Sequence, residues 1–526
     1  MASRLVSGCH LFMKPFRKRY LRHIFLLLLG GGVLTIAYIF LVSHIENIVE
    51  AKLVDIHGKS KSIEVDLLTR SVYLEKPEIL PSREIPLGIQ LNFLEVKGIQ
   101  LYALLVHETF AINTIRADSG KILYNKAIEK IRNDTIPQKA RSFTVQNLLL
   151  TNLICEIRTD TLIDFSSSVD FEATGVEINL SNLSYKLKSL KLNSRENNFS
   201  RSSGMYGMTI DQLRYSSEDQ KIIVDSFLLI PNYGKYEFGR QKGEQVGRIN
   251  VSVPKLVIEG IAVDEIIDTA FTASKIQITS FDLHSFKDKR VPFLRTKHIL
   301  LPMECFQQLP YPIAADTIII TDSRVTIEEI PETGTESGSV TIDHINAACG
   351  LITNRYHQRV PKYAALKASG LIMNQGEIKA VFSLPLDGSP TYFTTGSISD
   401  FPFEKLNPAL ENLAWFKIES GKLNNMKFNF RYTDLLSTGT MEIDYEDLRI
   451  IGLKKNTDDE SDIKTFVINT IVKNSKNGEV DKLKRTGTIN IERDRRRYIF
   501  NIWWKSLLDG LGSSILGIEK NPTRKK

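Results

Sequence analysis

A strict alternation of apolar and polar residues is the feature that most constrains how this chain folds. The apolar members of two such stretches, 423–433 and 440–451, are Met426, Phe428, Phe430, Tyr432, Met441, Ile443 and Tyr445. The segments 248–254 and 322–330 follow the same pattern. Because successive side chains of a β-strand point to opposite faces, each of these strands has one apolar and one polar face. The sequence therefore predicts a mainly β fold.

The connections between these strands favour antiparallel meanders. Turn residues occur at Asp387-Gly388, Asn477-Gly478 and Thr333-Gly334. Helical spacing of apolar residues is confined to a few short segments, chiefly 101–110 and 262–272. An apolar sheet face has to be covered, either by a second sheet in a sandwich or by a ligand lying in one long curved sheet. The period of two leaves both arrangements open.

One long apolar run, residues 23–43, predicts a transmembrane helix. About 20 residues at about 1.5 Å each span a hydrocarbon core of about 30 Å. The basic segment 1–22 precedes the run, which places that segment in the cytoplasm and the rest of the chain across the membrane. A cleaved signal peptide is the alternative. The run is longer than the apolar core of such a peptide, and no A-x-A-like cleavage site follows it.

The net charge of +7 is concentrated at the two ends of the chain. Residues 1–22 hold six basic and no acidic residues, and residues 493–526 hold nine basic and three acidic residues. Each end therefore carries +6, and the residues between them sum to −5. A nucleic-acid-binding body would be basic, so the charge distribution excludes that class.

Motifs that carry chemistry are missing from the sequence. None of the nine histidines has metal-site spacing, and no nucleophile elbow, phosphate-binding loop or dinucleotide fingerprint occurs. We therefore predict no catalytic residue, no cofactor and no metal. Of the cysteines beyond the membrane run, Cys305 and Cys349 could form a disulfide, and Cys155 would then remain single. Buried free thiols are the alternative.

The C-terminal segment 493–516 breaks the period of two. Its apolar residues recur every four positions from Ile499 to Ile515, which predicts a basic amphipathic helix. One interpretation is docking on a membrane surface or a partner protein. The other is a helix that plugs the end of the sheet. The docking candidates are Arg495, Arg496, Arg497, Phe500, Trp503, Trp504, Lys505 and Leu507.

Four consecutive segments of the C-terminal half share a pattern of glycine, proline and alternation. They are 369–388 (SGLIMNQGEIKAVFSLPLDG), 395–408 (TGSISDFPFEKLNP), 418–430 (IESGKLNNMKFNF) and 437–450 (STGTMEIDYEDLRI). This order resembles the C-terminal region of AsmA-like envelope proteins, the group that includes TamB-type members. The stretch 301–329 is similar to the middle region of the same group, and 493–517 is similar to its tail. The resemblance covers about 250–516 well and 45–250 loosely.

The resemblance implies a periplasmic protein anchored in the inner membrane of a diderm bacterium. It implies an elongated antiparallel β-groove with an apolar interior that serves phospholipid transport or outer-membrane biogenesis. The expected parts are an N-terminal groove region (44–250), an AsmA-like groove region (251–492) and the basic helix and tail (493–526). The residues expected to contact acyl chains are Met426, Phe428, Phe430, Met441, Ile443 and Tyr445.

Two further hypotheses come from other functional classes. The first is a scaffold that binds outer-membrane components through its C-terminal helix. The second is a type II membrane enzyme such as a glycosyltransferase, whose size and topology fit. The lack of a D-x-D motif beside an apolar strand and of α/β alternation argues against the enzyme.

Overall fold

The computed structural model confirms that the chain is mainly β with few helices. It describes residues 18–82, 86–100, 110–128, 142–159, 161–179, 184–200, 204–262, 270–294, 298–455, 463–466 and 485–516. The chain forms two compact units. The first comprises Met1–Leu149 and Glu177–Ser184, and the second comprises Leu150–Val176 and Tyr185–Lys526.

The first unit begins with a long helix and continues with short antiparallel strands. Its elements are α1 (Lys18–Asp55), β1 (Gly58–Lys59), β2 (Ser62–Asp66), β3 (Ser71–Glu75), β4 (Glu78–Ile79), β5 (Leu87–Lys97), β6 (Phe110–Asn125) and η1 (Lys126–Ile128). The strands β7 (Ser142–Thr159), β8 (Leu162–Asn179) and, through Ser184, β9 (Ser184–Lys186) contribute residues to both units.

The predicted membrane segment 23–43 falls within α1. The side chains of 18–34, 36 and 37 lie outside the described residues. In the part of the chain that the structure describes, no helix combines the length and the apolar character needed to span a bilayer.

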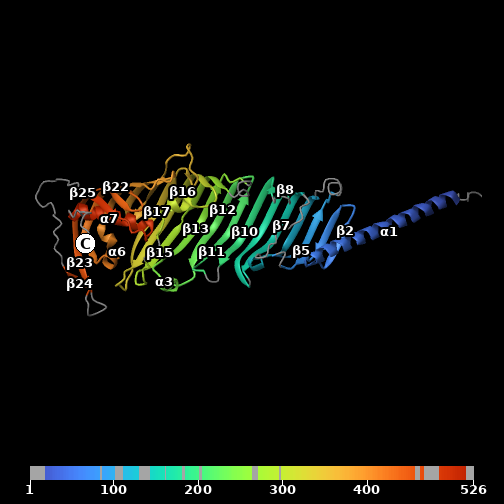
Figure 1. Cartoon of the computed structure of the whole chain (residues 1–526), viewed down its shortest axis with the longest axis horizontal. Coiled ribbons are helices and arrows are strands. Elements are labelled where there is room, and N and C mark those ends of the chain that lie inside the picture. The colour runs from blue at the N-terminus through green and yellow to red at the C-terminus, as the bar shows by residue number, and fades with distance from the viewer. Residues whose placement is uncertain are drawn as a thin grey trace, which may run out of the picture. The chain divides into compact units, whose positions relative to one another are not determined.

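The second unit is built around strands that follow one another in chain order from β8 to β25 (Figure 1). Its first strands are β9 (Ser184–Lys186), β10 (Ser189–Ser200), β11 (Tyr206–Ser216), β12 (Lys221–Pro231), β13 (Gly247–Glu259), β14 (Phe271–Thr279) and β15 (Asp282–Asp288). The later strands are β16 (Ile313–Ile330), β17 (Gly338–Cys349), β18 (Ile352–Thr353), β19 (Tyr363–Ile372), β20 (Gly376–Pro385), β21 (Tyr392–Pro402), β22 (Phe416–Tyr432), β23 (Leu436–Lys455), β24 (Ile463–Phe466) and β25 (Arg485–Glu492). The helices are α3 (Glu237–Lys242), α5 (Pro302–Gln307), η2 (Phe403–Leu406), α6 (Asn407–Leu413) and α7 (Ile499–Leu516).

The expectation of a purely antiparallel sheet is wrong at one place. Both β14 and β15 pair with β16 in parallel, so the sheet is mixed. Parallel neighbours need a connection that brings the chain back to the end of the sheet where the first strand began. Here this crossover, residues 289–312, contains the short helix α5. A period of two does not report strand direction, because side chains alternate in the same way in both arrangements.

The remaining local predictions can be placed on these elements. The alternating segments lie in β13, β16, β22 and β23, as expected. The turn at Asp387-Gly388 joins β20 to β21, with Gly388 at a φ of 77°, and Thr333-Gly334 lies between β16 and β17. The predicted helices 101–110 and 262–272 lie largely outside the described residues, although Phe110 begins β6 and Phe271 begins β14. The Asn477-Gly478 turn also lies outside them.

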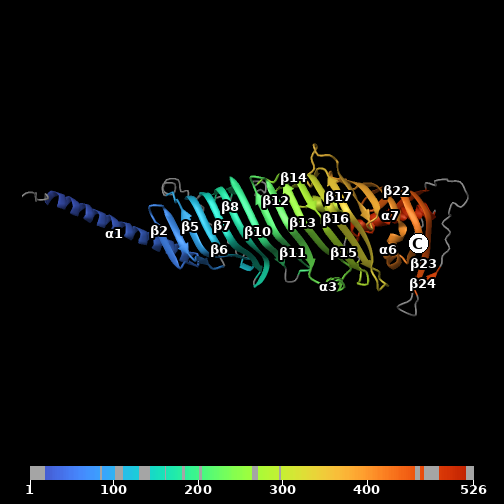
Figure 2. The ribbon, with the colours of Figure 1, turned by 180° about the vertical axis from the view of Figure 1, so that it is seen from behind.

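The largest core of the second unit lies where α7 packs against β22, β23 and β25 (Figures 1 and 2). Helix and sheet approach closely at Gly487 of β25. A Cβ added there would lie 2.3 Å from Ser514 Oγ and 2.5 Å from the Gly510 carbonyl oxygen of α7. Gly510 in turn lies against Met441 and Ile489. This contact requires glycine, because a larger residue would push the helix off the sheet.

We expect Gly487→Ala to lower the free energy of unfolding by about 1–3 kcal/mol, the usual cost of overpacking a core. Gly512→Ala is the matched control, because a Cβ at Gly512 of α7 meets nothing within 4 Å. That change should raise the free energy of unfolding by roughly 0.5–1 kcal/mol through helix propensity. Urea unfolding followed by tryptophan fluorescence measures both. Equal midpoints for the two variants would contradict the close approach.

Candidate functional site

Cross-strand pairing aligns apolar side chains into rows that run across the second unit. The first row joins directly paired residues from β8 to β25. Its members are Phe171, Leu192, Tyr215, Ile222, Ile258, Ile276, Ile318, Cys349, Leu366, Phe382, Thr394, Phe430, Gly439 and Ile489. Directly paired residues lie on the same face of a sheet. These side chains therefore form one continuous stripe.

Two further rows lie parallel to the first. The second row is Val169, Ser194, Leu213, Val224, Leu256, Ile278, Ile320, Ala347, Ala368, Ala380, Gly396, Phe428, Met441 and Gly487. The third row is Phe165, Phe199, Met208, Leu229, Val251, Leu283, Val325, Ile342 and Ile372. Ile372 and Phe430 belong to the same buried cluster, so the rows share one side of the sheet. We call the three rows the apolar face.

Burial of the apolar face changes along the sheet. From β8 to β16 most of its side chains, such as Leu229, Ile258 and Ile278, are only half-buried. From β21 onward they are fully buried, with Phe430 at 2% and Met441 at 0% exposure. An apolar surface that stays only partly buried over many strands is unusual for a folded domain. First-row residues such as Ile222 and Ile258 also pack against a small buried cluster that includes Tyr215 and Ala273, so this stretch combines a small core with partly accessible apolar side chains.

The helix α7 covers the buried end of the apolar face. Its apolar side packs on the core through Ile499, Ile502, Trp503, Leu507, Leu511 and Ile515. The Trp503 ring lies 4.8 Å from that of Phe382, a member of the first row. The crossover adds Leu301 and Met303 to the same cluster. The prediction that the helix plugs the end of the sheet matches this packing.

Three of the four basic residues expected on this helix lie before it. Arg495, Arg496 and Arg497 precede α7, which begins at Ile499, so the prediction of a helix from 493 is wrong at its start. Lys505 lies on the helix itself. The outward side of α7 exposes Phe500 at 48%, Trp504 at 36% and Leu508 at 40%. Docking of this side on a membrane or a partner stays a prediction.

The six residues expected to contact acyl chains are close together. Met426, Phe428, Phe430, Met441 and Ile443 are buried beneath α7, and Tyr445 is half-buried beside them. The Tyr445 hydroxyl accepts a hydrogen bond of 2.6 Å from Arg485 Nη1. Contact of these residues with a lipid stays a prediction, and it requires α7 to move away.

A polar clamp fastens the start of α7. The Arg493 guanidinium is 1% exposed, pairs with Asp434 and donates a hydrogen bond of 2.6 Å to the Ile299 carbonyl oxygen of the crossover. Asp434 also accepts from Arg495 Nε at 2.6 Å and lies 2.9 Å from His298 Nε2. Ile299 N donates to the Arg495 carbonyl oxygen at 2.8 Å. We define the clamp as Asp434, Arg493, Arg495 and His298.

Beneath α7, three buried polar groups interrupt the apolar packing. The Tyr432 hydroxyl, the Thr394 hydroxyl and Trp503 Nε1 form no hydrogen bond of good geometry with the described residues. Burial raises the pKa of Tyr432, which lies next to the other two. A buried polar group without a good partner costs about 1–3 kcal/mol. The Tyr432 hydroxyl lies close enough to Trp503 and Thr394 for weak hydrogen bonds with both, which offset part of this cost.

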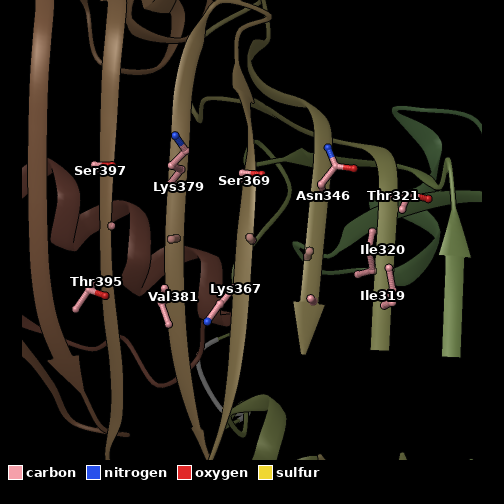
Figure 3. Close-up of a pocket in the computed structure, with 15 residues that line it drawn as sticks. Ile319, Ile320, Thr321, Asn346, Lys367, Ser369, Lys379, Val381, Thr395 and Ser397 are labelled. Atoms are coloured by element: carbon pink, nitrogen blue, oxygen red, sulfur yellow. The ribbon is translucent and has the colours of Figure 1, made fainter. Parts of the chain in front are cut away.

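A shallow hollow of about 540 Å³ lies on β16, β17, β19, β20 and β21 (Figure 3). The backbone of second-row residues such as Ala368 and Gly396 forms its floor. Its walls are the residues on either side of them, including Lys367, Lys379 and Thr395. Because neighbouring residues of a strand point to opposite faces, these walls lie on the opposite side of the sheet from the apolar face. The hollow is therefore separate from the candidate site.

Cysteine and metal chemistry are not evident in the described part of the chain. Cys155, Cys305 and Cys349 are free thiols, so the suggested Cys305–Cys349 disulfide is not formed. Burial raises the pKa of the Cys155 and Cys349 thiols, which favours the inert protonated form. Among the described residues, no three His, Cys, Asp or Glu side chains are grouped to hold a metal ion.

The charged residues at the edge of the apolar face were missed by sequence reasoning. Lys287 and Glu329 are paired across β15 and β16, and Arg497 lies next to Lys287. They are far apart in the chain, and each sits in an ordinary alternating or basic stretch. The one local clue in the sequence is Lys287, a charged residue at a position of β15 whose side chain points to the same face as that of Leu283.

Comparisons with known proteins do not identify a family. No family model matches the chain, and no curated protein matches it.

The clamp yields a prediction about stability. Asp434→Asn should lower the free energy of unfolding by about 3 kcal/mol, because it leaves the buried Arg493 charge without its carboxylate. Asp400→Asn is the control, since Asp400 and its partner Lys422 are more than half exposed at 3.6 Å. An exposed pair contributes little. Chemical denaturation of the full chain checks both, and a loss of less than 1 kcal/mol in Asp434→Asn would contradict the role of the clamp.

Proposed function

We propose that this chain carries lipid acyl chains along its apolar face, as a non-enzymatic transport or envelope-integrity factor. The observation that carries the proposal is the half-buried stretch of the three rows between β8 and β16, whose apolar side chains keep part of their surface accessible. A folded domain ordinarily buries such surface. The resemblance to AsmA-like envelope proteins supports the same function, and phospholipid is the cargo it implies.

Contact with the rows is favourable and nearly uniform along the sheet. Burial of each methylene group of an acyl chain contributes about 0.8 kcal/mol. The first row from Ile222 to Ile318 offers isoleucine side chains in successive strands, with no polar group between them. A chain moving from one strand to the next exchanges equivalent contacts. Such a surface holds lipid without fixing its position, which suits a conduit.

The setting belongs to the same proposal. Residues 23–43 would anchor the chain in the inner membrane of a diderm bacterium, with residues 1–22 in the cytoplasm and the body in the periplasm. The proposed partners are phospholipid acyl chains along the apolar face and an outer membrane or envelope protein at the outward side of α7. The proposal involves no chemical step and no cofactor.

Adjacent leucines of β12 allow a matched test of lipid contact. Leu229 belongs to the third row, between Met208 and Val251, whereas Leu228 is paired with Thr209 and Ser252 on the opposite side. A photo-crosslinking benzoylphenylalanine is placed at Leu229 or at Leu228 of the full chain in cells, and co-purified lipid is identified by mass spectrometry. We expect lipid adducts at 229 at least tenfold above those at 228.

Equal labelling at the two positions, or none at either, would exclude lipid transport along this face. Labelling at 228 alone would place the lipid on the polar side. The two positions share residue type, strand and degree of burial, so a difference in folding between the variants does not explain a difference in labelling.

Contact of lipid with the residues beneath α7 needs a separate test. Thr488 Oγ1 of β25 and Ser513 Oγ of α7 are 3.3 Å apart, so Thr488→Cys with Ser513→Cys would form a disulfide that holds α7 down. A photo-crosslinker at Phe430 should label lipid in the reduced protein and lose this labelling on oxidation. A crosslinker at Leu229 should label in both states.

Labelling at Phe430 that survives oxidation would show that lipid reaches this position without movement of α7. No labelling at Phe430 in either state would show that the six candidates form only a core.

The scaffold hypothesis keeps one supporting observation, the exposed Phe500, Trp504 and Leu508 of α7. Deleting 497–526 would uncover the core, so substitutions at these three residues are the appropriate probe of partner binding.

A further inference from the structure

The third row of the apolar face ends at a charged rim. Along β15, Leu283, Ser285 and Lys287 point to the same side, and Lys287 is paired with Glu329 of β16. Their Nζ and Oε1 atoms are 3.5 Å apart, and Lys289 contacts the other carboxylate oxygen of Glu329. The apolar side of the sheet therefore becomes cationic at this edge.

The segment before α7 adds two more cations to this rim. The Arg497 guanidinium lies 3.7 Å from the centre of the Phe293 ring and donates a hydrogen bond of 3.2 Å to Gln245 Oε1. Arg496 lies 5.3 Å from the same ring. Both arginines face Asp494, Arg496 through two hydrogen bonds and Arg497 at 3.8 Å. We call Lys287, Lys289, Arg496 and Arg497 the basic rim.

The basic rim carries more positive than negative charge. Its four cations face two carboxylates, Glu329 and Asp494, which leaves an excess of two positive charges. The neighbouring Arg290 is already neutralised by two hydrogen bonds to Asp288. The side chains of Lys287 and Arg497 are each only 19% exposed, so water screens their mutual repulsion poorly.

The pKa of Lys287 responds to its burial and to this excess of positive charge. Burial, together with the charges of Arg497 and Lys289, lowers the pKa of Lys287, and the Glu329 carboxylate only partly opposes this. Glu329 has a lowered pKa because Lys287 and Lys289 outweigh its burial. A cation held near other cations in a half-buried place is stabilised by an added anion. The rim is therefore suited to bind one.

We propose that the basic rim binds the phosphate of a phospholipid headgroup, with Lys287 and Arg497 as its principal contacts, while the acyl chains lie on the rows behind it. This inference rests on the proposed function and extends it by assigning a headgroup class. Guanidinium and ammonium groups form strong charge-assisted hydrogen bonds with phosphate. The alternative source of the same chemistry is free phosphate.

The geometry matches an amphiphile. Leu283 precedes Lys287 by four residues on the same side of β15, which corresponds to about 13 Å along an extended strand. A phosphate at Lys287 therefore leaves its acyl chains within reach of Leu283, Val251 and Val325 of the third row. The Phe293 ring beneath Arg497 holds that guanidinium in place by a cation–π contact.

The test compares two lipids with identical acyl chains, phosphatidylglycerol and diacylglycerol, which lacks phosphate. The full chain is incubated with vesicles containing both, and bound lipid is counted by native mass spectrometry. We expect wild type to prefer phosphatidylglycerol and Lys287→Gln with Arg497→Gln to reduce that preference about tenfold. Lys287→Arg should retain it. Lys367→Gln, on the opposite side of the sheet, is the matched control and should leave it unchanged.

Each outcome separates this inference from the proposed function. Binding of neither lipid by wild type would overturn lipid transport itself. Binding of both lipids equally, or a preference that survives the double variant, would overturn the basic rim alone. Inorganic phosphate that binds with the same affinity in the absence of lipid, and displaces no lipid, would identify a phosphate site in place of a headgroup site.

Discussion

The register of the strands is the constraint on which the rest of this structure depends. A slip of one residue between two strands would turn every later apolar side chain to the opposite face. The rows nevertheless continue from Phe171 to Ile489. Irregular residues with positive φ, such as Ser226, Ser280 and Asp322, occur at matching positions of neighbouring strands, so the rows stay aligned on both sides of them. The pairing resumes in the same register after Ser226 and Ser280, so these residues interrupt the strands without inserting an extra residue. Pro254 lies opposite Ser226, where the loss of its N–H removes no regular hydrogen bond.

Two elements, the crossover and α7, cover the buried β21–β25 part of the apolar face. Both lie far in the sequence from some of the strands that they cover. The crossover places Leu301 and Met303 on the sheet, and α7 packs beside them. The clamp joins the two covering elements, because Arg493 contacts Asp434 of the β22–β23 turn as well as the Ile299 carbonyl oxygen. The same segment positions Arg497 at the basic rim. The segment before α7 thus holds the cover of the core in place. It also supplies positive charge to the basic rim at the edge of the apolar face.

Local patterns predicted the strands and the helix but not their assembly. Alternation at Met426, Phe428 and Phe430 identified a one-faced strand, and spacing by four from Ile499 identified the apolar side of α7. The parallel direction of β16 was not predicted, because side chains alternate in the same way in parallel and antiparallel neighbours. The helix start was placed too early, because the arginines before Ile499 continue its apparent basic face while their partners, Asp434, Asp494 and Gln245, lie in other parts of the fold. The basic rim was not predicted either, because its residues come together only when β15, β16 and the segment before α7 have assembled.

The parallel pairing at β16 also determines the order in which the strands of the second unit can pair during folding. From β10 to β13 each strand pairs with the next along the chain, so these contacts are local and can form in succession from hairpins. The strand β16 cannot join β14 and β15 until residues 289–312 have brought the chain back to the end of the sheet where β14 begins, and α7 cannot dock until β25 is in place. Loop closure over such distances slows folding. A chain synthesised from its N-terminus would therefore complete the β8–β16 part of the apolar face before the part that α7 covers.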